Sequence, residues 1–200
     1  MHFKIMKIKK LLPLDTPPKK IFFTGVPGSR WSGIAQEIEE VFDADCSDRT
    51  PEREYSHESF SGHKGAYFGT GMEFPAVFSE TNLDAPYSCQ HGLTDKCRIH
   101  KSHEWAYMLD TLSQVYPKSW IVLVYRDNNN SYKWWKEAGG WNIQYPNYDW
   151  YTNDDIMKEK IQEQNELILD FANRNNLEWN QHYQFSDVFI AVWKKEFSES

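Results

Sequence analysis

Short apolar runs alternate along this chain with segments in which apolar residues recur every three or four positions. The apolar runs are predicted strands, and they occupy residues 20–24, 97–101, 120–125 and 188–193. The run WIVLVY at 120–125 is continuously apolar and rich in β-branched residues, which is typical of a central parallel strand covered on both faces.

The segments between these runs have the period of amphipathic helices. The apolar faces consist of Ile34, Ile38, Val41 and Phe42; of Trp105, Met108, Leu109, Leu112, Val115 and Tyr116; and of Ile156, Ile161, Ile168 and Phe171 in a long third helix. Ser102 is the predicted N-cap of the second helix, and Pro117 ends it. A polar helix over about 130–138 is predicted to end at Gly139-Gly140.

The alternation of strands and helices predicts a single α/β domain over residues 1–200, with three αβα layers and a central parallel sheet. Residues 43–95 are polar, rich in Gly, Ser, His and aromatic residues, and lack sustained periodicity, so we expect a loop-rich insertion there. In such sheets, ligands bind beyond the carboxyl ends of the strands. Three of the predicted strands end at residues that can bind or react with a ligand.

The composition agrees with a folded domain. Hydrophobic residues make up 40% and aromatic residues 16% of the 200 residues, so the chain can bury a substantial core. The net charge of −7 disfavours nucleic acid as a partner, because the average field repels a phosphate backbone. An anionic ligand would therefore have to be held by a local group of cations and backbone amides.

The sequence also bears on compartment and metal binding. The first twenty residues contain no uninterrupted apolar run, so we predict neither a signal peptide nor a membrane span and expect a cytoplasmic protein. Three cysteines, Cys46, Cys89 and Cys97, are an odd number, and we expect them to be reduced. Cys89, His91 and Cys97 lack the CxxC spacing and the fourth ligand of a zinc site, so no metal site is predicted.

The first predicted strand leads directly into a Gly-rich turn, residues 25–32 with the sequence GVPGSRWS, and then into a helix. This order presents backbone N–H groups and the positive end of a helix dipole to one point, which suits a phosphate. The Walker pattern GxxxxGK[ST] is met at Gly25 and Ser32, but Arg30 replaces its second glycine and Trp31 its lysine. The guanidinium of Arg30 can supply the charge of the missing lysine. The alternative is a tight turn with a serine cap.

Three segments together resemble the sulfotransferase family. TGVPGSRWS at 24–32 resembles the family's 5′-phosphosulfate loop, with Gly28 in the place of a lysine. Lys101-Ser102-His103 resembles its KTH signature, and the strand-ending VYR at 124–126, followed by Ser131, resembles its 3′-phosphate site, although five residues separate Arg126 from Ser131 here and eight in the family. The segments occur in the family's order, and residues 125–141 look like phage and bacterial outliers of the family.

The resemblance implies a P-loop-like fold and an enzyme that transfers a sulfonate from 3′-phosphoadenosine 5′-phosphosulfate (PAPS). The acceptor would be a hydroxyl or amine of a small molecule or glycan, and no metal would be needed. His103 would be the general base, while Lys101 and Arg30 would stabilise charge. The residues that would bind the donor are Gly25, Pro27, Gly28, Ser29, Arg30, Trp31, Ser32, Arg126 and Ser131.

The position of His103 supports this role independently of the resemblance. It follows a strand end and begins a helix, and both the positive end of that helix and the neighbouring Lys101 favour the neutral imidazole that a base needs. His100 points to the opposite side of the strand by alternation, so we expect it to be structural.

Several alternatives remain open at the level of sequence. Glu37 is an alternative base, since Golgi-type sulfotransferases use a glutamate on the helix after the phosphate loop, but the run of Glu37, Glu39 and Glu40 favours a solvated helix face. The chain could instead be a P-loop nucleotide or small-molecule kinase, or a non-catalytic nucleotide-binding protein. Residues that would lie either in an acceptor site or in ordinary structure are His57, His63, Trp134, Trp135, Trp141, Tyr145, Tyr148, Trp150 and Tyr151.

Overall fold

A mixed sheet with the strand order β2-β1-β3-β5-β4 forms the centre of the computed structural model, which describes residues 17–47, 96–143 and 150–195. Strands β1 (Lys20–Gly25), β2 (Arg98–Lys101) and β3 (Trp120–Arg126) are parallel. Strand β5 (Val188–Lys194) is antiparallel to both β3 and β4 (Asn180–Gln181). The strands predicted from the sequence are present, whereas the two-residue β4 was not predicted.

The predicted central parallel sheet is present in β2, β1 and β3, but the sheet as a whole is mixed, and the connection between β4 and β5 explains why. A parallel neighbour needs a crossover of a dozen or more residues, but only six residues join β4 to β5. This short connection makes β5 run back along β4, and β5 then lies between β4 and β3. Consequently the amino end of β5 lies beside the carboxyl end of β3, where Arg126 pairs with Val188.

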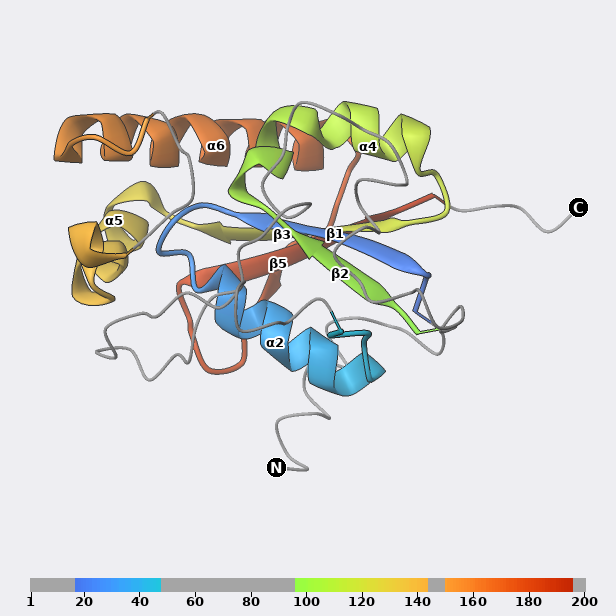
Figure 1. Ribbon diagram of the computed structural model, residues 1–200. Helices are drawn as coiled ribbons and strands as arrows, with labels where there is room; N and C mark the ends of the chain where they lie inside the picture. The colour runs from blue at the N-terminus through green and yellow to red at the C-terminus, as the bar shows by residue number, and fades with distance from the viewer. Residues whose placement is uncertain (1–16, 48–95, 144–149, 196–200) are drawn as a thin grey trace, which may run out of the picture.

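Helices cover both faces of this sheet, which gives three layers (Figure 1). Helix α2 (Trp31–Phe42) packs on the face that carries Ile21, Phe23 and Val122. The opposite face, with Phe22 and Ile121, packs against the helices η3 (His103–Met108), α4 (Leu109–Val115) and α6 (Asp154–Arg174). The two cores follow the alternation of side chains along each strand.

The second predicted helix is divided into the 3₁₀ helix η3 and the α-helix α4. Ser102 is its N-cap as predicted, because its hydroxyl accepts a hydrogen bond from the backbone N–H of Glu104 at 3.1 Å. Val115 is 53% exposed, so its predicted place in the apolar face is wrong.

Helix α5 (Asn128–Glu137) begins two residues earlier than predicted and lies beyond the carboxyl end of β3 (Figure 1). The short 3₁₀ helix η4 (Gly140–Asn142) follows it.

None of the helices in the described ranges is long and apolar enough to cross a lipid bilayer. Most of the predicted insertion, residues 48–95, lies outside the described residues, together with Cys89, His91, His57 and His63. Cys97 is a buried thiol, and burial raises its pKa to about 12.

Candidate functional site

The connection between β1 and α2 is a tight turn over Val26-Pro27-Gly28-Ser29. The backbone N–H of Ser29 donates to the carbonyl of Val26 at 3.0 Å, and Gly28 has a φ of 78°. Proline at the second position and a glycine with positive φ at the third are the features of a type II turn. The sequence therefore makes this sharp reversal at the carboxyl end of β1.

Gly28 also brings this turn into close contact with α5. A Cβ atom on Gly28 would lie only 1.9 Å from the backbone oxygen of Ser131, so no other residue fits without a shift of backbone. Residues about one hundred positions apart in the sequence are thus packed against each other at the ends of β1 and β3. This contact joins the first and third of the segments on which the family resemblance rests.

Arg30 follows the turn at the N-cap position of α2, with a φ of 66°. Its guanidinium carbon lies 3.6 Å from the ring centre of Trp134 and 3.9 Å from that of Phe185, so it stacks between two aromatic rings. Partial burial lowers the pKa of Arg30, and the charge of Arg126 lowers it further, while Asp187 opposes both effects. The two guanidinium groups therefore lie within electrostatic range of each other.

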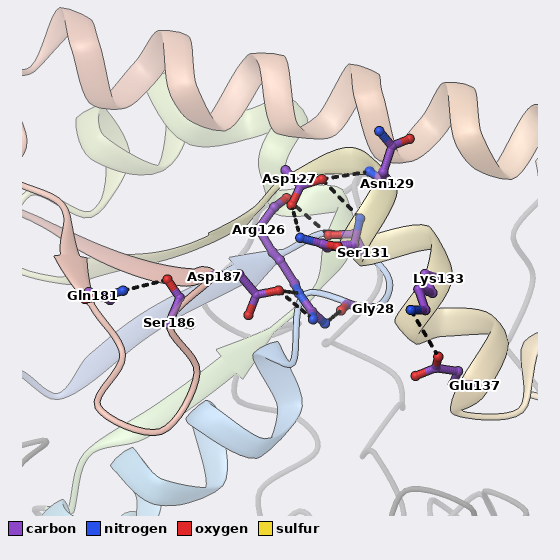
Figure 2. Close-up of polar contacts among 11 residues, drawn as sticks. Gly28, Arg126, Asp127, Asn129, Ser131, Lys133, Glu137, Gln181, Ser186 and Asp187 are labelled. Carbon is purple, nitrogen blue, oxygen red and sulfur yellow. Dashed lines mark hydrogen bonds and ion pairs between the residues drawn. The ribbon is translucent and has the colours of Figure 1, made fainter.

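Arg126 ends β3 and reaches back to the same turn, as Figure 2 shows. Its Nη1 donates to the carbonyl of Gly28 at 3.2 Å, and its Nε and Nη2 both lie 2.7 Å from Oδ2 of Asp187. Neither Asp187 nor Phe185 is predicted from the sequence as part of a site. Their placement depends on the antiparallel β5, which the apolar run at 188–193 predicts as a strand but without a direction.

His103 makes the second contact with the turn region. Its Nδ1 lies 2.5 Å from the backbone oxygen of Gly25, and its ring centre is 4.2 Å from that of Trp31. Because a carbonyl can only accept, Nδ1 carries the proton and Nε2 is the basic atom. Burial lowers the pKa of His103 to about 4, although the bond to Gly25 opposes this shift. His103 is therefore a neutral imidazole at neutral pH.

Lys101, the last residue of β2, is directed onto α2. Its ammonium nitrogen lies 3.0 Å from Oε1 of Glu39, and both side chains are buried. A role for Lys101 at a transferring sulfonate would require its ammonium to exchange this ion pair for the ligand. His100 lies on the other face of the strand, where its ring stacks on Phe22 at 5.6 Å, in agreement with its predicted orientation.

The serines of the predicted donor site have different surroundings. Ser131 is buried, and its hydroxyl donates to the carbonyl of Arg126 at 3.1 Å. Ser29 is also buried, and among the described residues its hydroxyl has no hydrogen-bond partner. Ser32 lies half-buried in the first turn of α2, whose N-terminus has no side-chain cap in the described residues. Ser29 and Ser32 thus lie in the β1–α2 turn and at the start of α2, whereas the hydroxyl of Ser131 bonds within the first turn of α5.

The expectation of a solvated acidic face on α2 is wrong for two of its three glutamates. Glu37 and Glu39 are buried, and only Glu40 is exposed. Oε2 of Glu37 lies 3.7 Å from Nε2 of His182 and accepts a hydrogen bond from the hydroxyl of Tyr183 at 3.4 Å. Polar partners from the connection after β4 and from β2 explain this burial, which the charge pattern of one helix does not reveal.

The aromatic residues after β3 divide between the core and the site. Trp135 is fully buried in the core, and Trp150 donates to Glu104 at 3.2 Å. Trp141 and Tyr151 pack against each other at 4.6 Å, whereas Trp134 lies on Arg30. Tyr145 and Tyr148 lie outside the described residues.

Comparison of the chain with family models, with curated proteins and with solved structures gave no match. Over residues 17–47, 96–143 and 150–195, no group of three or more histidine, cysteine, aspartate or glutamate side chains is arranged to hold a metal ion.

Proposed function

We propose that this protein is a P-loop-like sulfotransferase that uses PAPS as its sulfonate donor. The proposal is supported by the way in which three distant segments meet at one turn. His103 bonds to Gly25, Arg126 bonds to Gly28, and Arg30 lies beside Arg126. These are the segments that resemble the phosphosulfate loop, the KTH signature and the 3′-phosphate site.

The chemistry needs little covalent work from the protein, because positioning and charge neutralisation dominate transfers of this kind. Backbone N–H groups of the turn and of the first turn of α2 would hold the 5′-phosphosulfate, together with the hydroxyls of Ser29 and Ser32. Arg30 would neutralise charge on the oxygen that bridges phosphorus and sulfur. The acceptor oxygen or nitrogen forms a bond to sulfur as that bridging bond breaks, and adenosine 3′,5′-bisphosphate leaves.

His103 would act as the general base. Because Nδ1 carries the proton that bonds to Gly25, the neutral imidazole has its basic lone pair on Nε2. Nε2 would take the proton of the acceptor hydroxyl or amine as the new bond to sulfur forms. Arg126 would bind the 3′-phosphate through charge-assisted hydrogen bonds, a contact that a nucleotide without this phosphate cannot make.

Calorimetry with adenosine 3′,5′-bisphosphate and with AMP tests the donor site. We expect the bisphosphate to bind at least tenfold more tightly, and Arg126→Ala to remove the difference. Arg174→Ala is the matched control, since it deletes an arginine that pairs with exposed carboxylates of Asp110 and Asp170. Equal affinity of the wild-type protein for both nucleotides would contradict the proposal.

A non-catalytic nucleotide-binding protein is the second candidate, and two observations favour it. His103 is completely buried, and Lys101 is held by Glu39. Turnover of labelled PAPS with a panel of phenols, sugars and amines separates the two functions. For an enzyme, His103→Ala should lower turnover about 100-fold or more with little change in nucleotide affinity. Tight binding of the bisphosphate without transfer to any acceptor in the panel would favour the second candidate.

A further inference from the structure

The connection between β4 and β5, residues 182–187, supplies partners for both arginines of the site. The ring of Phe185 lies 3.9 Å from the guanidinium of Arg30, and Asp187 binds Arg126 through two contacts of 2.7 Å. Neither residue belongs to the segments that resemble the sulfotransferase motifs. A single short connection therefore contacts both arginines, and Figure 2 shows Asp187 beside Arg126.

Asp187 is the principal counter-ion of this pair among the described residues. The repulsion between Arg30 and Arg126 is opposed first by Asp187 and then by Glu137. Glu137 is about half exposed and lies 4.0 Å from Lys133, so solvent and a second cation weaken its effect. Asp187 instead contacts the guanidinium of Arg126 directly, where charge-assisted bonds are strongest.

The exposures of the two partners show which of them can leave. The Arg126 side chain is 12% exposed and is also anchored to the carbonyl of Gly28, whereas the side chain of Asp187 is 36% exposed. Rotation of Asp187 into solvent would leave Arg126 in place with its Nε and Nη2 directed toward the vacated position. An external anion could then take the same bonds.

We infer that Asp187 is an internal competitor that an anionic ligand must displace from Arg126, and that it thereby sets the affinity of the site for anions. The inference rests on the proposed function in that the ligand is a phosphate-bearing nucleotide. Because Asp187 is part of the chain, its carboxylate is present at Arg126 at a high effective concentration, in the millimolar range or above for short linkages. A weakly binding free anion would have to exceed about this concentration to replace it. A singly charged anion brings no more charge to Arg126 than Asp187 does, whereas a phosphate monoester brings a second charge, which Arg30 attracts from within electrostatic range. Asp187 therefore lowers the affinity for any anion that takes its bonds, and a doubly charged phosphate overcomes this cost more readily than a monoanion does.

Asp187→Asn tests this role because it removes the charge with little change in shape. Inorganic phosphate at pH 8, where it is mostly a dianion, and dimethyl phosphate, a monoanion, are the probes for calorimetry. We expect the variant to bind phosphate roughly tenfold more tightly than the wild type does, by the strength of a charge-assisted bond. Binding of dimethyl phosphate should increase by no more than this factor, because the cost of displacing Asp187 is common to both anions and its remaining repulsion is greater for the dianion. Asp110→Asn is the control, since Asp110 pairs with Arg174 at an exposed position.

Unchanged or weaker binding of phosphate by a folded Asp187→Asn would overturn the inference. Should this variant not fold, nuclear magnetic resonance of the arginine Nε–H groups gives the answer in the wild-type protein. The signal of Arg126 should shift during titration with phosphate, as its Nε exchanges the carboxylate for the ligand. A fixed Arg126 signal while calorimetry detects binding would also overturn it.

These results are separable from those that test the proposed function. If Asp187→Asn gains affinity for phosphate while the wild type binds adenosine 3′,5′-bisphosphate and AMP equally, the competitor role stands and the sulfotransferase proposal fails. If the bisphosphate is preferred and Asp187→Asn gains nothing, the donor proposal stands without the competitor.

Discussion

His103 illustrates how burial and one hydrogen bond set the state of a residue that the sequence singles out. The KSH segment predicts a base at the end of a strand, and the structure adds the carbonyl of Gly25 and the ring of Trp31 as its neighbours. Burial accounts for most of the depression of its pKa. The tautomer, which decides which nitrogen can accept a proton, depends on a contact between residues 78 positions apart and could not be predicted from the sequence.

The depressed pKa of His103 predicts a loss of stability in acid. Its pKa is about 4 in the folded protein and about 6.5 in the unfolded chain. Above pH 6.5 the imidazole is neutral in both the folded and the unfolded state, so His103 does not lower the free energy of unfolding. Between pH 6.5 and 4 only the unfolded chain takes up the proton, and the free energy of unfolding falls by up to about 3 kcal/mol. Urea unfolding of the wild type and of His103→Gln over pH 4–8 measures this difference.

The comparison of the two proteins isolates His103 from other buried histidines, such as His100 and His182, because both proteins keep those residues. The wild type should lose more stability than His103→Gln as the pH falls from 6.5 to 4. Parallel curves for the two proteins would show that the imidazole is not held neutral. The ring signals of His103 in a titration followed by nuclear magnetic resonance give the folded-state pKa directly.

The two arginines of the site could be predicted from the sequence, whereas the residues that contact them could not. Arg30 and Arg126 were predicted because they sit at a Gly-rich turn and at a strand end, positions defined by local patterns. Trp134, Phe185 and Asp187 complete the site only through tertiary contacts. Ser131 was predicted to bind phosphate, but its hydroxyl bonds to the carbonyl of Arg126.

At the scale of elements, the strands and helices were largely predictable because each has a clear hydrophobic period. The bounds of β1, β3 and β5 differ from the predicted runs by one residue. The direction of β5 was not predictable, since a run of six apolar residues reads the same for parallel and antiparallel strands. The burial of Glu37 and Glu39 was missed for a related reason, because their partners come from β2 and from the β4–β5 connection.

The start of α5 yields a prediction that separates a helix cap from a metal ligand. Asp127 accepts hydrogen bonds at 3.1 Å from the backbone N–H groups of both Asn129 and Asn130. Asp127→Ala should therefore lower the free energy of unfolding by about 1 kcal/mol, whereas Asp127→Asn should retain most of it, because asparagine is also a good N-cap. Thermal unfolding of the two variants beside the wild type provides the measurement.

The same pair of variants bears on the kinase alternative, in which an aspartate after this strand would hold Mg²⁺. With Asp127 acting only as a cap, Asp127→Asn keeps the nucleotide affinity of the wild type. A large loss of Mg²⁺-dependent ATP binding in a stable Asp127→Asn would assign the carboxylate to a metal and favour the kinase.

At the scale of the whole molecule, an acidic protein with a net charge of −7 concentrates two arginines at the carboxyl ends of two neighbouring strands. The mean field opposes anionic ligands, so affinity must come from the local cations and the backbone N–H groups of the turn. Salt should weaken this binding, because the attraction between partly exposed charges decays over a screening length of about 8 Å at physiological ionic strength.

The charge arrangement also predicts the response to chelation. In the proposed mechanism the two guanidinium groups and the N-terminus of α2 neutralise the donor, and a sulfonate carries less charge than a phosphoryl group, so no divalent ion is required for binding or transfer. Calorimetry with adenosine 3′,5′-bisphosphate should give the same affinity in excess EDTA as in Mg²⁺, and sulfonate transfer to any acceptor found should continue. ATP with and without Mg²⁺ is the comparison, since a kinase depends on the metal to bridge the β- and γ-phosphates. Loss of activity on chelation that Mg²⁺ restores, together with tighter binding of Mg²⁺-ATP than of the bisphosphate, would replace the sulfotransferase with the kinase.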